Sequence, residues 1–194
     1  MRAFHRKIPL KYLKISIGIA ILLSIFGWSL YDRFTDAPYQ KIIFSNTLHT
    51  NERVVVRKMF AEEISESKRA GGFDNIEIAI AKYDLNHDGI QDIFVMISGS
   101  SFCGSQGCRT MIYTVDKHTR WHEAYSFNTY PAWGVSSQKH NGYFDLVRVG
   151  PVDGHPVSDC FLLNYEWKNG FYEGVGYRKL TKKDLEVLVD DDIR

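Results

Sequence analysis

Short apolar runs bounded by turn residues follow one another from residue 75 onward, a pattern typical of β-strands. Isoleucine alternates with smaller or charged side chains at 76–81, and the unbroken apolar run 93–98 predicts a central strand that forms a hairpin with 110–116. Asn141-Gly142 and Asn169-Gly170 are strong signals for tight turns. Further strands are expected at 121–127, 143–149 and 160–167.

Helical patterns flank these strands on both sides. Thr50 begins a predicted helix that runs to about Lys68, and Gly71-Gly72 follow as a stop signal. Near the C-terminus, Thr181 and Asp184 form a capping-box-like pattern before the apolar segment LEVLV. These elements predict an α+β fold over 50–194, a small domain in which a twisted antiparallel sheet has flanking helices.

The first 31 residues carry a different pattern. Residues 1–14 contain five basic side chains and no acidic one, and 15–31 are uncharged and mostly apolar. A helix of that length reaches about 25 Å, the short end of a membrane span. Together with the positive-inside rule, this predicts an N-terminal transmembrane helix, a signal anchor at 15–31, after a cytoplasmic segment at 1–14. A cleaved secretory signal is the alternative, although no small-x-small cleavage site follows.

This topology sets the expected localisation. Residues 32–49 become a connector, and the domain at 50–194 lies in the periplasm, tethered to a bacterial inner membrane by a single pass. The net charge of the whole chain is +1. Because the basic residues concentrate before the anchor, the remainder is mildly acidic, the opposite of what a nucleic-acid-binding protein of this size usually shows. We therefore expect no nucleic-acid partner.

The segment DLNHDGIQD is the sharpest chemical motif in the chain. Asp84, Asn86 and Asp88 present side-chain oxygens at alternate positions, while the glycine at 89 permits a tight turn. Ile90 can add its backbone carbonyl, and Asp92 a further carboxylate. Because Ca²⁺ prefers such oxygen ligands, these five residues predict a structural calcium-binding loop. The alternative is a polar hairpin turn that holds no metal, since Asn, Asp and Gly favour turns in any case.

Three cysteines define the redox chemistry. Cys103 and Cys108 flank the flexible loop GSQG, and in an oxidising compartment such a pair closes a small ring. We predict this disulfide bond. A zinc pair has weaker support, because no second cysteine pair or histidine ligand lies nearby. Cys160 lies in a strand-like run and is expected to be a small buried side chain, although its pairing with either of the other two stays open.

The stretch from Asp84 to Cys108 resembles a pattern of uncharacterised exported bacterial proteins, in which a D-x-N-x-D-G loop, an apolar strand and C-G-S-x-G-C follow in order. A later N-G-aromatic-D-L segment of that pattern is matched by Asn141, Gly142, Tyr143, Asp145 and Leu146, with Phe144 inserted before the Asp. A final Gly-x-Tyr hairpin corresponds to Gly170 and Tyr172. The resemblance implies a small secreted or periplasmic β-rich domain and no known reaction.

The calcium motif is also similar to the loops of EF-hand, dockerin and FG-GAP/VCBS-type modules. It departs from the EF-hand pattern at loop position twelve, where Val95 replaces the bidentate Glu. A strand follows the loop where an EF-hand has a helix. The resemblance therefore implies a calcium clip between strands and argues against a calcium sensor.

The sequence contains few candidates for a catalytic motif. His118 and His122 lie in a predicted turn and form no H-E-x-x-H pattern, and 98–101 contains no G-x-S-x-G motif. Asp153 and His155 fall in a connection rich in Gly and Pro. The sequence leaves enzymatic activity uncertain and favours a non-catalytic role.

These observations predict a membrane-anchored periplasmic binding or interaction module with a structural calcium loop, such as an immunity or inhibitor protein that contacts another protein of the bacterial envelope. A disulfide-held loop suits this role because it is a preorganised insert for a cleft. Two alternatives remain, a hydrolase of an envelope polymer such as peptidoglycan, and a structural subunit of an inner-membrane complex.

Overall fold

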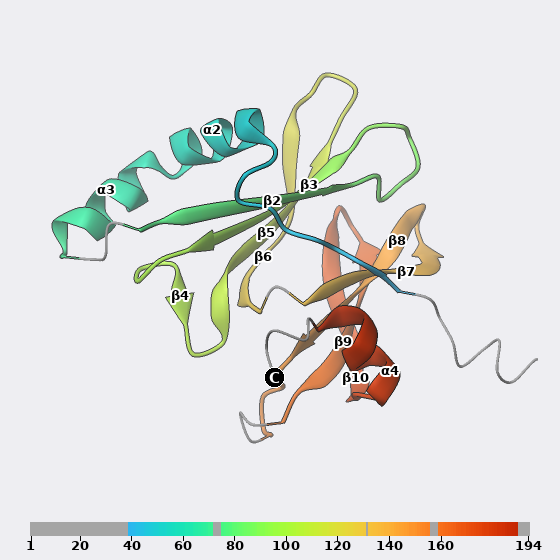
Figure 1. The fold of residues 1–194 in the computed structure, drawn as a ribbon. Coiled ribbons are helices and arrows are strands. Elements are labelled where there is room, and N and C mark those ends of the chain that lie inside the picture. Colours follow the sequence, from blue (N-terminus) through green and yellow to red (C-terminus); the bar gives the residue numbers. More distant parts are fainter. Residues whose placement is uncertain (1–38, 72–74, 131, 156–158, 190–194) are drawn as a thin grey trace, which may run out of the picture. The chain divides into compact units, whose positions relative to one another are not determined.

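The computed structural model describes residues 39–71, 75–130, 132–155 and 159–189. Of these residues, 49% lie in strands and 18% in helices. The strands form two five-stranded antiparallel sheets (Figure 1). The expected α+β fold around one antiparallel sheet is therefore wrong: the described part is mostly β, because strands that the sequence placed in one sheet divide between two.

Sheet A has the strand order β1-β7-β8-β9-β10. Its strands are β1 (Gln40–Lys41), β7 (Trp133–His140), β8 (Tyr143–Gly150), β9 (Phe161–Lys168) and β10 (Phe171–Lys179). The turns at Asn141-Gly142 and Asn169-Gly170 form as predicted, with positive φ at all four residues, as a tight two-residue hairpin loop requires. The sequence pattern does not predict strand β7, because its second half, residues 137–140, is polar and exposed.

Sheet B contains β2 (Glu77–Tyr83), β3 (Asp92–Ser98), β4 (Cys103–Gly104), β5 (Gly107–Val115) and β6 (Trp121–Thr129). Strand β5 pairs with β3, β4 and β6. The hairpin expected between 93–98 and 110–116 is confirmed by the pairing of β3 with β5. The isoleucines at 78 and 80 share one face of β2 as predicted, but both faces of that strand are buried.

The two sheets share one buried cluster. Sheet A contributes Trp133, Val135, Leu146, Tyr165, Trp167 and Tyr172, and sheet B contributes Ala81, Phe94, Ile112 and Ala124. Tyr125 of β6 packs edge-on against Trp133 and Tyr165, with ring centroids 5.3 and 5.4 Å apart. Aromatic pairs of this geometry stabilise the contact beyond the area that they bury.

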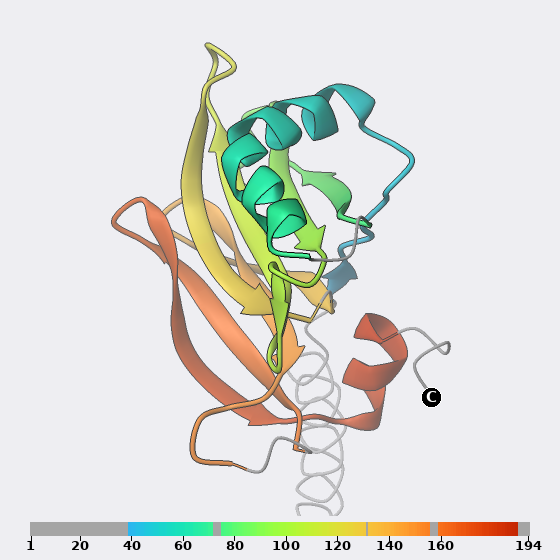
Figure 2. The same cartoon turned by 90° about the vertical axis from the view of Figure 1, so that its left-hand side faces the viewer.

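Helices cover the other face of each sheet. In Figure 2, α2 (Thr50–Met59) and α3 (Ala61–Arg69) lie against sheet B, where Val56, Phe60 and Ile64 join the isoleucines of β2 and β3. The single helix predicted over 50–68 is in fact two, because Phe60 leaves helical geometry between them. On sheet A, α4 (Lys182–Leu188) packs Leu188 against Val147, Val149 and Leu162.

The segment 39–45 joins the edges of the two sheets. Strand β1 pairs with β7, and the Ile42 amide donates to the Trp133 carbonyl at 2.9 Å. Three residues later, Ser45 exchanges two backbone hydrogen bonds with Ile80 of β2, at 2.9 and 3.0 Å. Part of the predicted connector 32–49 thus pairs with both sheets.

Among the residues that the structure describes, no helix has the length and hydrophobicity needed to cross a membrane. This finding contradicts the expected N-terminal transmembrane helix and, with it, localisation at the bacterial inner membrane with a periplasmic domain. The segments 1–14 and 15–31 themselves lie outside the described residues.

Candidate functional site

The loop between β2 and β3 folds on its own side-chain oxygens. The Asp84 carboxylate accepts hydrogen bonds from the amides of Gly89 at 2.9 Å and Asp88 at 3.2 Å. Asp88 accepts from the Ile90 amide at 2.8 Å, and Asn86 donates its side-chain N–H to Asp88 at 2.9 Å. The oxygens that the sequence assigned to Ca²⁺ are therefore used to hold a turn.

Asp92, at the start of β3, lies in the protein interior, where only 1% of it is exposed. Its two carboxylate oxygens accept hydrogen bonds from the amides of Leu85 and Val115, each at 2.9 Å. Burial raises the pKa of this carboxyl to about 6, against the opposing effect of the two amide donors. Asp92 connects the loop to the end of β5.

The loop also docks on the hairpin between β7 and β8. The Phe144 amide donates to the Leu85 carbonyl at 2.8 Å. The His87 ring packs edge-on against Phe144 with centroids 4.6 Å apart, and Asn86 reaches the Tyr143 hydroxyl at 3.4 Å. The loop therefore ties sheet B to sheet A through its own residues.

This geometry corrects the calcium-binding expectation. Across the described ranges, no group of three or more His, Cys, Asp or Glu side chains is placed to hold a metal ion. Among the expected ligands Asp84, Asn86, Asp88, Ile90 and Asp92, the Asp92 carboxylate accepts from two buried amides, and the carboxylates of Asp84 and Asp88 accept from amides within the loop.

Cys103 and Cys108 form the expected disulfide bond, which closes the tip between β4 and β5. The Tyr130 hydroxyl donates to the Ser105 carbonyl at 3.2 Å, so the end of β6 supports this tip. Cys160 is a free thiol and is exposed, which corrects the expectation of a buried side chain.

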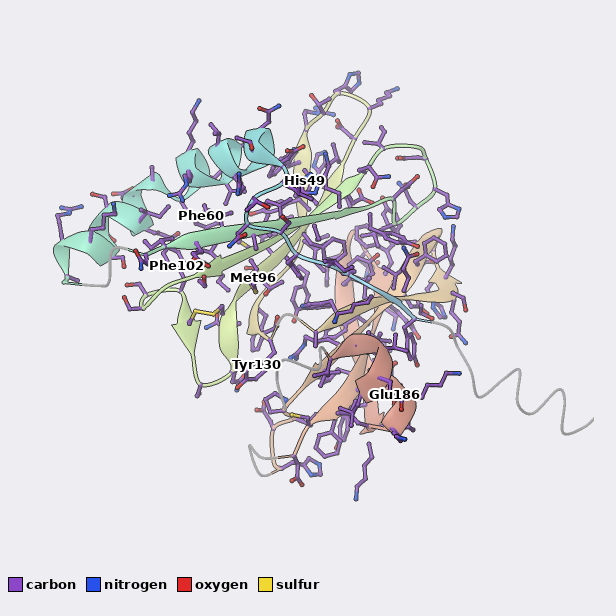
Figure 3. The ribbon with its side chains drawn as sticks, viewed as in Figure 1. His49, Phe60, Met96, Phe102, Tyr130 and Glu186 are labelled. Carbon is purple, nitrogen blue, oxygen red and sulfur yellow. A yellow bond between two sulfur atoms is a disulfide. The ribbon has the colours of Figure 1, made fainter. Side chains whose placement is uncertain are left out.

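An apolar cleft of about 500 Å³ opens beside α4. Its walls come from the segment after β1, from β3, from the residues after β6 and from α4, and the cleft is defined by Ile43, Phe44, Met96, Tyr130, Leu185 and Leu188. Figure 3 labels Met96 on β3 and Tyr130 after β6, which line the cleft, and Glu186 on α4, the helix that carries Leu185 and Leu188. Of the residues lining the cleft, only Lys41, Tyr130 and Cys160 have a polar or reactive side chain.

Two contacts fix the α4 wall. The predicted capping box is confirmed: the Thr181 hydroxyl accepts from the Asp184 amide, and the Asp184 carboxylate accepts from the Thr181 amide at 2.7 Å. Arg178 of β10 donates two hydrogen bonds to the same carboxylate, at 2.6 and 2.8 Å. Such two-pronged pairs add geometric specificity, so α4 has a defined position at the cleft.

Carboxylates or aromatic rings contact the side chains of His87, His122, His140 and His155. His122 contacts Asp116 at 3.2 Å on the surface, and His155 packs against Phe161 with ring centroids 4.7 Å apart. His140, which the sequence did not single out, bonds Asp145 at 2.7 Å, and this hydrogen bond raises the pKa of the imidazole. The candidate residues His118, His122, Asp153 and His155 form no catalytic group with one another in the contacts of the described chain.

Comparison with known proteins found no matching family model, no matching curated protein and no matching solved structure. The proposals below therefore depend on the geometry alone.

Proposed function

We propose that this chain is a non-catalytic binding protein that holds an elongated apolar ligand in the cleft beside α4. The observation that carries the proposal is the cleft itself, about 500 Å³ in volume with walls of aliphatic and aromatic side chains. Ligand sites in proteins are concave, mostly apolar and about 300–1,000 Å³ in volume. The proposal keeps the expected binding role and replaces a protein partner with a small ligand.

The exposure of the wall residues supports this function. Ile43 is 76% exposed, Tyr130 is 42% exposed and Leu185 is 38% exposed, although all three line one depression. Leaving large apolar side chains in water is unfavourable by about 25 cal/mol for each Å². A ligand that covers them recovers this free energy on binding.

The chemistry of the walls supports binding over catalysis. Lys41, Tyr130 and Cys160 supply the only polar side chains there, and the Tyr130 hydroxyl already donates to Ser105. General acid–base catalysis needs a positioned proton donor or acceptor beside the reacting group. The cleft offers contact area with few positioned proton-transfer groups, and such a surface recognises the shape and hydrophobicity of a ligand.

The test is a fluorescence titration of the full chain with N-phenyl-1-naphthylamine, a neutral probe that becomes bright in apolar surroundings. We expect saturable one-to-one binding that weakens about tenfold or more, or about 1.4 kcal/mol, in Ile43→Glu and Leu185→Glu. Val55→Glu is the matched control, because Val55 is 42% exposed on α2 and does not line the cleft.

Unsaturable binding, or equal weakening by all three variants, would overturn the proposal. Circular dichroism and the unfolding midpoint of each variant show whether the fold is kept.

A further inference from the structure

A second pocket, of about 390 Å³, lies between α2 and the start of β2 and shares no lining residue with the cleft beside α4. Two arginines of α2, Arg53 and Arg57, line this pocket, and they share one face of the helix because they are four positions apart. The pocket therefore has two cationic side chains on one wall. Its other lining residues are Asn46, Thr50, Val54, Ile76, Glu77 and Ile78.

Hydrogen bonds to the surrounding chain position both guanidinium groups. Nη2 of Arg53 donates to the Thr47 carbonyl at 3.1 Å and to the Thr50 hydroxyl at 3.2 Å. Nη2 of Arg57 donates to the Ile76 carbonyl, on the β2 side of the pocket, at 3.4 Å. In the contacts of the described residues these bonds use one nitrogen of each guanidinium. The N–H groups of Nε and Nη1 are thus left to bind a ligand.

Neither arginine has a carboxylate within ion-pair distance among the residues that the structure describes. By contrast, Arg109, Arg120 and Arg178 each contact a carboxylate at 2.6–2.7 Å. Like charges four positions apart on a helix destabilise it. An anion that binds between Arg53 and Arg57 relieves this repulsion, and the relief adds to the free energy of binding.

Two further features of the pocket favour an anion that carries an organic group. Thr50 is the first residue of the ten-residue helix α2, and the amides at the start of a helix attract negative charge. Val54 lies between the two arginines in the sequence, lines the same pocket and is 46% exposed. An apolar group beside the bound anion would cover this side chain.

We propose that the α2 pocket binds a small organic phosphate monoester, with its dianionic head group on Arg53 and Arg57 and its organic group against Val54. A guanidinium is a planar fork of N–H donors that matches the oxygens of a phosphate. Two forks one helical turn apart can bond different oxygens of the same phosphate. The two charges of the head group also match the two cations, whereas a carboxylate supplies only one.

A basic surface that only attracts anions through its charge gives a different expectation. Binding would then depend on ionic strength and on the net charge of the chain. Loss of any exposed arginine would weaken it equally, and the organic group of the ligand would not matter. Matched arginine variants and matched ligands separate the two cases.

The experiment is isothermal titration calorimetry of the full chain with phenyl phosphate at pH 8, where a phosphate monoester is a dianion. We expect saturable one-to-one binding, about tenfold tighter than that of inorganic phosphate or of benzoate. Arg53→Met and Arg57→Met each weaken the binding of phenyl phosphate about tenfold. Glu77→Gln strengthens it, because this change removes the one carboxylate among the residues that line the pocket.

Arg69→Met is the matched control. Arg69 of α3 also donates to a backbone carbonyl, that of Ser65 at 3.5 Å, but does not line the pocket. An unchanged affinity in Arg69→Met supports the proposal, and equal weakening in this variant overturns it. Arg57→Lys keeps the charge without the fork and keeps the proposal testable where a methionine variant does not fold. Weaker binding by Arg57→Lys supports the proposal, and wild-type affinity overturns it.

The matched ligands decide the remaining points. Unsaturable binding of phenyl phosphate overturns the proposal. Equal affinity for benzoate overturns it as well, since the pocket would then need no dianion, and so does equal affinity for inorganic phosphate, since the organic group would then make no contact. Circular dichroism of each variant shows whether the fold is kept.

Discussion

The buried carboxylate of Asp92 accepts a hydrogen bond from the amide of Val115, 23 positions later in the chain, at 2.9 Å. Together with the bond from Leu85 to the other oxygen, this contact anchors the polar loop between β2 and β3 to the end of β5. A segment that looks like a cation site in the sequence therefore acts as a connection between strands.

We predict that Asp92→Asn destabilises the fold by about 1–3 kcal/mol, the usual cost of leaving a buried donor without an acceptor. The amide offers one oxygen and one NH₂ group, so one of the two buried N–H donors loses its partner. Urea unfolding at pH 5 measures the loss. Asp88→Asn, on the exposed part of the loop, keeps an acceptor for Ile90 and changes stability by less than about 0.5 kcal/mol.

The stability difference between wild type and Asp92→Asn depends on pH. Because burial raises the pKa of Asp92 to about 6 in the folded state, the protonated carboxyl is favoured there. The protonated Asp92 carboxyl contributes its full stabilisation below about pH 4, the pKa of an aspartate in the unfolded chain. This stabilisation is lost as the pH rises through 6, the pKa in the folded state. The difference in free energy of unfolding between the wild type and Asp92→Asn is therefore larger at pH 4.5 than at pH 7.5. The change in this difference is on the order of 2 kcal/mol.

A direct check is the carboxyl ¹³C chemical shift of Asp92 across this range of pH. A titration midpoint near 6 supports a raised pKa of the buried Asp92 carboxyl, and a midpoint below 4 contradicts it.

The disulfide between Cys103 and Cys108 predicts how many thiols of the chain react before and after reduction. Iodoacetamide modifies one thiol, that of Cys160, in the unreduced chain and three after reduction, and the masses of the intact protein distinguish the two states. Replacing both bonded cysteines with serine lowers the free energy of unfolding by about 2 kcal/mol, the loop-entropy effect of a short ring. Cys160→Ser is the control and has little effect on stability.

Gly150→Ala tests the position of Arg148. An added methyl group collides with Nη1, so the guanidinium must move from its place against the Trp133 and Tyr165 rings, at a cost of about 1–3 kcal/mol. Gly176→Ala is the matched control, because nothing lies within 4 Å of the added carbon. Thermal unfolding of both variants decides the point: equal midpoints would show that Arg148 does not lie over Gly150.

Thr181→Ala tests whether a defined α4 is needed for the cleft. Loss of the capping hydroxyl destabilises the first turn of this helix by about 1 kcal/mol. Because Leu185 and Leu188 form one wall, we expect weaker binding of the neutral probe with little change in the urea midpoint of the sheets. Thr47→Ala, in an exposed segment before α2, serves as the control.

The sequence predicts local features well where one residue type decides the geometry. The two Asn-Gly turns and the capping box at Thr181 are of this kind, and β3 is recognisable from its unbroken apolar run. Strand β7 is missed because it begins buried and ends in exposed polar residues. The division into two sheets is also missed, since alternation in one strand says nothing about which strand pairs with it.

The cleft could not have been predicted, because its walls come from segments as distant as Ile43 and Leu188. A different feature was available from the sequence: Arg148 is a lone charge within the apolar run LVRVG, at a position whose alternation assigns it to a buried face, and it lies between the sheets against Trp133 and Tyr165. The disulfide was predictable because its two cysteines are close in the chain.

Methionine methyl groups can report directly on whether an apolar ligand binds in the cleft beside α4. Met96 lines the cleft, Met111 lies in the cluster of sheet B beneath the helices, and Met59 is exposed on α2. In the full chain labelled with ¹³C at methionine methyls, addition of N-phenyl-1-naphthylamine should shift the Met96 signal in a saturable manner and leave Met59 and Met111 in place. An unmoved Met96 signal, or a larger shift at Met59, would contradict binding in the cleft.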